Sequence, residues 1–91
     1  MATSRTDSRE STGESAVKEL VGRNIAAARR DREWTQRELA DAAGVRDDQQ
    51  VSKWERGIYM PEGHALIALA AALKRDLAWF YVDHDIEAAA A

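Results

Sequence analysis

The sequence predicts a single compact all-α domain of five helices with flexible termini. Apolar residues recur at the three- to four-residue spacing of a helix from about residue 16 to residue 86. No run of β-branched residues alternates long enough to predict a strand. Capping residues and glycines divide this stretch into separate helices. At 91 residues, the chain has room for one small domain.

The two ends of the chain are predicted to lie outside this domain. Residues 1–15 are rich in Ser, Thr, Arg and Glu and have no large apolar residue after Met1, so we expect a disordered arm. Residues 87–91 are a short alanine-rich tail. The folded domain is therefore expected to span residues 16–86.

The first two helices have clear sequence signals. The first is expected at about Ala16–Asp31, and the second begins at Thr35, which forms a capping box with Glu38. Gly44 ends the second helix because glycine adopts the left-handed conformation without steric cost. The residues expected to face the core are Val17, Leu20, Val21, Ile25, Ala28, Leu39, Ala40 and Ala43.

Three further helices follow a short turn that contains Val45 and Arg46. Asp47 or Asp48 is the expected N-cap of the third helix, which ends near Arg56 with Gly57 as the terminating residue. Pro61 is expected to open the fourth helix and Asp76 to cap the fifth. Their expected apolar residues are Leu66, Leu69, Ala70 and Leu73 in the fourth, and Leu77, Phe80 and Tyr81 in the fifth.

Two segments carry a specific resemblance. Thr35-Gln-Arg-Glu-Leu-Ala-Asp-Ala-Ala-Gly44, followed by Val51-Ser-Lys-Trp-Glu-Arg-Gly57, closely resembles the helix-turn-helix of the Cro and phage-repressor family, also called the xenobiotic-response-element (XRE) family. The likeness extends from about residue 20 to residue 82. It implies a λ-repressor-like five-helix domain that binds double-stranded operator DNA through its third helix in the major groove.

The resemblance also implies which residues read the bases. These are the first exposed residues of the third helix and one residue a turn later, namely Asp48, Gln49, Gln50 and Lys53. Gln pairs bidentately with adenine, Lys donates to guanine, and Asp accepts from cytosine. An acidic residue at a helix N-terminus is also favoured by the helix dipole, which gives Asp48 a purely structural alternative.

Other positions are implied to contact the DNA backbone or to hold the fold together. The phosphate contacts are Gln36, Arg29, Ser52 and Arg56. Arg29 is also implied to form a structural ion pair with Glu55. Ordinary exposure on the surface is the alternative for Gln36, Ser52 and Arg56.

One departure from the family concerns the turn. Six residues separate Gly44 from Val51, where the family usually has five. Either Arg46 is looped out, or the third helix starts elsewhere and presents different residues. We predict that the insertion is absorbed before Asp48, with Gln49 exposed.

Composition restricts the other functions that the chain can have. There are 13 basic and 16 acidic residues, giving a net charge of −3, and no cysteine. The acidity lies mostly in the C-terminal third, while Arg23, Arg29, Arg30 and Arg32 gather within ten residues. His64 and His84 lack a third ligand at useful spacing, so we expect no metal site, and we expect no cofactor. We expect no enzymatic activity, because nothing places a serine beside an oriented base and a domain this small has little room for a substrate pocket. We expect a cytoplasmic protein without a membrane span, associated with the nucleoid of a bacterial host cell.

The sequence also suggests partners. Trp79, Phe80 and Tyr81 are consecutive and cannot all face one core, so this segment is the candidate homodimer interface. The leading hypothesis is a transcriptional repressor that a phage or prophage encodes. The alternatives are an antitoxin or anti-regulator that binds a protein through its N-terminal arm, and nonspecific DNA binding.

Overall fold

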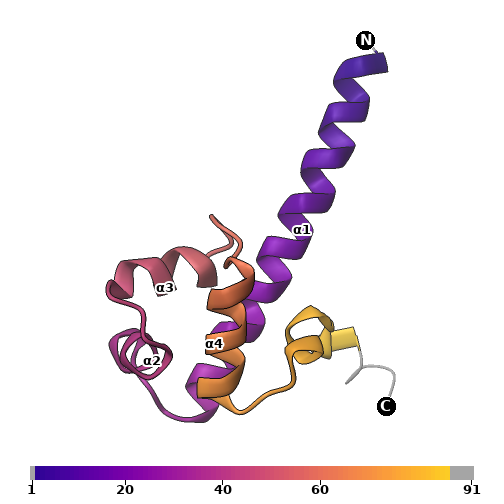
Figure 1. Ribbon diagram of the computed structural model, residues 1–91. Coiled ribbons are helices and arrows are strands. Elements are labelled where there is room, and N and C mark those ends of the chain that lie inside the picture. Colours follow the sequence, from indigo (N-terminus) through magenta and orange to yellow (C-terminus); the bar gives the residue numbers. More distant parts are fainter. Residues whose placement is uncertain (1, 87–91) are drawn as a thin grey trace.

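The described part of the chain forms the α-helices α1 to α4 and the 3-10 helix η1 (Figure 1). The computed structural model describes the backbone of residues 2–86 and the side chains of residues 13–86. The elements are α1 (Ala2–Asp31), α2 (Gln36–Ala43), α3 (Asp48–Glu55), α4 (Gly63–Leu73) and the 3-10 helix η1 (Leu77–Tyr81). No strand occurs among the described residues, so the all-α fold class predicted from the sequence is confirmed.

A single apolar core holds the helices together. Helix α1 packs against α3 and η1, while α2 packs against α3 and α4. In Figure 1, α2 and α3 lie on one side of α4, and the C-terminal segment lies on the other. The buried residues of the core are Val21, Ile25, Ala28, Leu39, Ala40, Val51, Trp54, Leu66, Leu69, Ala70, Leu73 and Phe80.

Helix α1 is longer than the sequence predicts. Its backbone is helical from Ala2, whereas we expected an arm over residues 1–15 and a helix from about Ala16. A packed helix extends at low cost, because each added residue gains one hydrogen bond without a new nucleus. Val17 is 44% exposed and is not among the buried residues of the core, so its predicted place on the core face is wrong. The predicted tail, residues 87–91, lies outside the described residues.

The fourth helix begins later than predicted. Pro61 is buried, Glu62 has an extended backbone with φ −66° and ψ 158°, and α4 starts only at Gly63. Pro61 therefore belongs to the connection between α3 and α4 and not to the helix itself. The four apolar residues predicted for this helix are all buried, as expected.

The fifth element is a 3-10 helix, and only one of its three predicted apolar residues is buried. Phe80 is in the core, but Leu77 and Tyr81 are exposed. Asn24 explains this geometry, because its buried amide donates to the carbonyl oxygens of Phe80 at 2.8 Å and Val82 at 2.9 Å. These carbonyls thus bond to a side chain of α1 and do not continue an α-helical ladder.

None of the helices within residues 2–86 is both long and apolar enough to cross a bilayer.

Candidate functional site

The site begins with helix α2, whose ends are defined by side chains near them in sequence. Thr35 Oγ1 accepts a hydrogen bond from the Glu38 amide at 3.0 Å, and Glu38 Oε1 accepts one from the Thr35 amide at 2.8 Å. The predicted capping box is therefore present. Gly44 ends the helix with φ 73°, a conformation that favours glycine.

The turn that follows α2 places the start of α3. The Val45 amide donates back to the Ala40 carbonyl at 2.7 Å, and Asp47 Oδ1 accepts from the Gln49 amide at 2.9 Å. Asp47, one of the two predicted candidates, is therefore the N-cap, and α3 begins at Asp48. The additional residue of the turn lies before Asp48, where the sequence analysis placed it.

Helix α3 has one buried face and one free face. Val51 and Trp54 are buried in the core. Gln49 is exposed and Lys53, one turn later, is partly exposed, so the two lie on the side of the helix that faces away from the core. Arg56, directly after the helix, is also exposed. Asp48 at the start of the helix and Ser52 within it are partly exposed. The free face thus presents amide and cationic groups.

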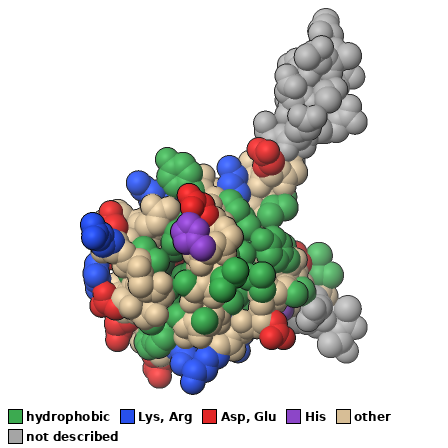
Figure 2. All heavy atoms as spheres, in the orientation of Figure 1, with side chains coloured by type: hydrophobic (Ala, Val, Ile, Leu, Met, Phe, Trp, Pro, Cys, Tyr) green, Lys and Arg blue, Asp and Glu red, His purple; other side chains and the backbone are tan. Residues whose placement is uncertain are grey.

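Charges of both signs border this face. Figure 2 shows basic and acidic side chains side by side over the part of the surface formed by α2 and α3. Lys53 Nζ lies 5.8 Å from the centre of the Tyr59 ring, within the range of a cation–π contact. This surface is therefore not a uniformly basic patch, which agrees with the acidic net charge of the chain.

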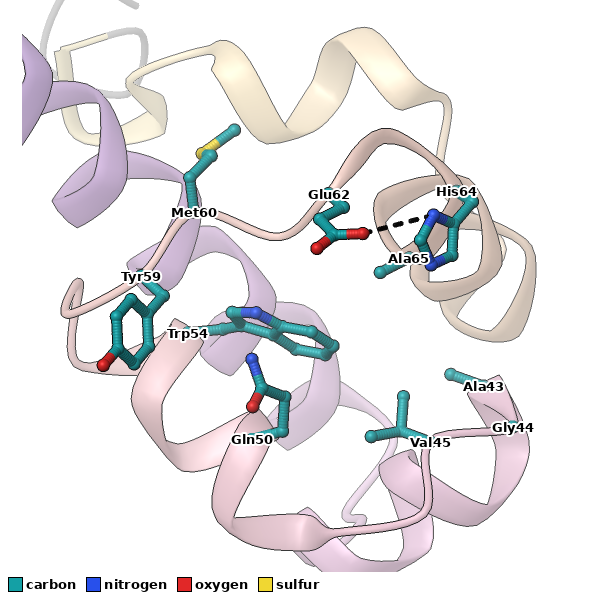
Figure 3. A pocket seen from close by; sticks show the side chains of 10 residues that line it. All are labelled: Ala43, Gly44, Val45, Gln50, Trp54, Tyr59, Met60, Glu62, His64 and Ala65. Atoms are coloured by element: carbon teal, nitrogen blue, oxygen red, sulfur yellow. Dashed lines mark ion pairs between the residues drawn. The ribbon is translucent and has the colours of Figure 1, made fainter.

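Gln50 lies apart from the other predicted base contacts. It is half-buried and lines a surface pocket of about 590 Å³ between α3, the end of α2 and the start of α4. Figure 3 shows its amide beside the ring of Trp54, with Val45 and His64 also around the pocket. Gln50 is one residue from Gln49, a rotation of about 100° around the helix, so the two side chains point in different directions. The sequence analysis grouped them, and the structure separates them.

An ion pair ties α3 to α1. Arg29 Nε lies 2.7 Å from Glu55 Oε2, and Arg29 Nη2 lies 3.1 Å from Glu55 Oε1, so the predicted pair is present and bidentate. The side chains are only 12% and 6% exposed. Gln36 Nε2 also donates to Glu55 Oε1 at 3.0 Å, which adds α2 to the same network. One carboxylate thus joins three helices.

This network changes the roles predicted for two phosphate contacts. Arg29 also donates from Nη1 to the Trp34 carbonyl at 2.7 Å, so each guanidinium nitrogen has a protein acceptor and little of the group is exposed. The structure supports the ion pair of Arg29 and does not support its phosphate contact. Gln36 is partly exposed, and its side-chain amide is oriented by Glu55.

Arg37 belongs to the site, although the sequence analysis did not single it out. It is exposed near the start of α2, and its guanidinium bonds to Asp41 Oδ1 at 2.7 Å and to the Arg46 carbonyl at 3.2 Å. The hydrogen bond and charge of Asp41 are the largest causes that raise the pKa of Arg37. The four-residue spacing of Arg37 and Asp41 on a helix was a signal available from the sequence.

The predicted dimer segment is only partly exposed. Phe80 is fully buried, so it has no surface to offer a partner. Tyr81 is 49% exposed, and Trp79 is partly buried against Phe80 and His84. The prediction that the three aromatic residues cannot share one core is correct, and Phe80 is corrected from an interface residue to a core residue.

The two histidines contact different parts of the protein. His64 Nδ1 is 3.6 Å from Glu62 Oε2 at the exposed start of α4, and His84 Nε2 is 2.9 Å from the Trp79 carbonyl. Among the described residues, no three His, Asp or Glu side chains are grouped as metal ligands.

Comparisons with known proteins agree with this geometry. A family model described as helix-turn-helix matches residues 25–80. The solved structure of the clp gene regulator ClgR from C. glutamicum is 31% identical, with a TM-score of 0.65, and the match covers 81% of this chain and 90% of that one. A hypothetical transcription factor, NHTF, from Neisseria has a TM-score of 0.75 at 23% identity, with 86% and 88% covered. No curated protein sequence matches the chain.

Proposed function

As a member of the XRE family of helix-turn-helix proteins, the chain is a DNA-binding transcriptional regulator, and we propose that it is a sequence-specific repressor. The observation that carries this proposal is the free face of α3. Gln49 and Lys53 lie there one turn apart, while Val51 and Trp54 fix the opposite face in the core. An α-helix held in this way fits the major groove, which is about 12 Å wide.

We infer a division of roles among the residues of the site. Gln49 and Lys53 read base edges from the outer face of α3, and Asp48 accepts from a cytosine amino group at its N-terminus. Ser52, Arg56 and the first amides of α2, near Gln36, contact phosphates on the two sides of the groove. Gln50 stays at the edge of the groove, because its side chain lines the pocket beside Trp54.

Repression is proposed to follow from occupancy of the operator. The core of the described residues joins all five elements in one DNA-binding fold, so a bound protein blocks access to the DNA beneath it. We propose that it acts in the cytoplasm of a bacterium, without catalysis, and that a phage or prophage encodes it.

The direct test compares binding to two DNA duplexes at physiological salt. One comes from the region upstream of the protein's own gene, and the other is its scrambled sequence. We expect a preference of about a thousandfold for the first, at the lower end of the usual range for specific binding. Gln49→Ala and Lys53→Ala should each reduce it by about tenfold, because one good base contact contributes about 1–3 kcal/mol.

Lys74→Ala is the matched control, because it removes one exposed lysine at the end of α4 and leaves α3 unchanged. It should retain the full preference. Equal and weak binding of the wild-type protein to both duplexes would contradict the proposal, and would favour the alternative in which the main ligand is a protein.

A homodimer is the second part of the proposal. Exposed Tyr81 and partly exposed Trp79 remain from the segment that the sequence analysis selected. Two copies related by a two-fold axis would read half-sites about 34 Å apart. Sedimentation equilibrium at micromolar concentration should show a dimer that Tyr81→Ser weakens. A monomer at all concentrations up to the high micromolar range would refute this part.

A further inference from the structure

The turn between α2 and α3 is fixed at both ends but has little to hold its middle. Gly44 and Val45 close the end of α2, and Asp47 caps the start of α3. Arg46 between them is exposed and contributes no side chain to the core. The core fixes the body of α3, and polar contacts made by this segment add to what holds its N-terminal end.

Arg37 supplies such a contact from helix α2. Its Nη1 donates to the Arg46 carbonyl at 3.2 Å, and its Nη2 donates to Asp41 Oδ1 at 2.7 Å. Asp41 lies one turn later on the same helix, so it holds the guanidinium against α2 while the other nitrogen reaches the turn. The planar fork of arginine makes both bonds at once, which the single ammonium of lysine does less well.

We propose that Arg37 is a positioning residue that sets the N-terminal end of α3, and with it the alignment of Asp48 and Gln49 to the bases. The proposal rests on the proposed function, since it concerns how the DNA-reading face is held. Hydrogen bonds to base edges weaken steeply with poor alignment, so a turn that moves should reduce discrimination between sequences.

Arg37 also affects the electrostatics at the start of α3, because several carboxylates surround it. Asp41, Asp47 and Asp48 all stabilise its cationic form and so raise the pKa of Arg37. In return, the guanidinium offsets negative charge at the start of α3, where phosphates of bound DNA would approach.

A direct phosphate contact is the alternative role for an exposed arginine, and conservative substitution separates the two. Arg37→Lys retains the positive charge that a phosphate contact needs, but loses the paired bonds to Asp41 and Arg46. Arg37→Met removes the charge as well. Asp41→Asn keeps Arg37 and weakens only the anchor that holds it.

The experiment uses duplexes that the wild-type protein selects from a randomised pool, together with their scrambled versions. For each variant, the measurements are the ratio of the two Kd values and the dependence of Kd on salt. We expect the ratio of the Kd for the scrambled duplex to the Kd for the selected duplex to fall about tenfold in Arg37→Lys and in Arg37→Met. In Asp41→Asn it should fall by less. Arg37→Lys should leave the slope of log Kd against log salt unchanged.

A second readout needs no DNA. Amide exchange at Val45, Gln49 and Gln50, whose N–H groups are hydrogen-bonded on the two sides of the turn, should be faster in Arg37→Lys, while the core amides of α1 and α4 keep their protection. This pattern also shows that the variant is folded.

Two results would overturn the proposal. One is an unchanged ratio in Arg37→Met. The other is a pair of observations: Arg37→Lys retains the full Kd ratio, and Arg37→Met reduces the slope of log Kd against log salt by about one. Together these two observations would identify Arg37 as a phosphate contact. If the wild-type protein itself selects no sequence, the proposed function fails, and that outcome is distinct from either result.

Discussion

Gly22 is the position where substitution should disturb the site most. It lies in α1 at the contact with the end of α3, and both neighbours are backbone atoms. A Cβ atom placed on Gly22 would lie 2.3 Å from the Trp54 carbonyl oxygen and 2.8 Å from the Glu55 carbonyl oxygen. Gly22→Ala should therefore push α3 away from α1.

The size of the effect follows from these distances. Ordinary contact begins at 3.4 Å, so the Trp54 carbonyl must move by 3.4 − 2.3, or about 1.1 Å. Overpacking of a core costs about 1–3 kcal/mol, and the upper end applies here because no flexible side chain can yield. Alanine offsets about 1 kcal/mol of this through its helix propensity. The expected net loss in the free energy of unfolding is about 2 kcal/mol.

Thermal and urea unfolding measure this loss, with Gly13→Ala as the matched control. Gly13 lies in the same helix, and a Cβ there would meet nothing within 4 Å. The melting temperature should fall by about 8–16 °C in Gly22→Ala, and it should rise by a few degrees in Gly13→Ala. If the two variants are equally stable, the close packing of α1 against α3 is not as the structure describes.

Three further substitutions test contacts that support the site. Glu55→Ala should lower the free energy of unfolding by about 3 kcal/mol, because it leaves the guanidinium of Arg29 enclosed without its carboxylate. Urea unfolding measures this loss. The double variant Arg29→Met with Glu55→Met should recover most of it, since neither charge is then buried. A loss below about 0.5 kcal/mol in the single variant would mean that the pair is effectively solvated. Asn24→Ala should cost about 2 kcal/mol and speed amide exchange in η1, since it removes the donor to the Phe80 and Val82 carbonyls; unchanged exchange would contradict this. Lys74→Gly should raise the melting temperature by a few degrees, because Lys74 ends α4 with φ 56°, and a decrease would show that this strain is negligible.

Local sequence signals predicted the helix-turn-helix well, because they act over a few residues. The capping box at Thr35 and the left-handed Gly44 depend on short-range hydrogen bonding and backbone sterics, and both are present. The position of the longer turn also followed, since an Asp before α3 is a strong N-cap. The family resemblance supplied the pairing of Arg29 with Glu55, which spacing alone does not indicate.

Features that depend on three-dimensional packing were missed. Gly22 resembles any helical glycine in the sequence, and only the approach of α3 explains it. The sequence did not show which of the three consecutive aromatic residues is buried, because this depends on how η1 packs on α1, where the Asn24 amide donates to the Phe80 carbonyl across more than fifty residues of sequence. Gln50 was grouped with Gln49 because the family resemblance implied both, and only the orientation of α3 on the core separates the two side chains.

The two ends of α3 are held by different sets of residues, and this has a consequence for DNA recognition. At the C-terminal end, Gly22 and Arg29 of α1 contact the backbone and side chain of the last turn, and Gln36 of α2 bonds to Glu55. At the N-terminal end, α2 holds the turn through Arg37. Displacement at either end should pivot the helix about the other.

Base preferences should therefore change at different positions of the half-site in the two variants. Gln49 lies near the end controlled by Arg37, so Arg37→Lys should relax the preference for the bases that Gln49 reads. Lys53 lies near the end controlled by Gly22, so Gly22→Ala should relax the preference for the base that Lys53 reads. Selection from a randomised duplex pool with each variant measures this directly. Loss of preference at the same positions in both variants would show that α3 moves as one rigid unit with the turn.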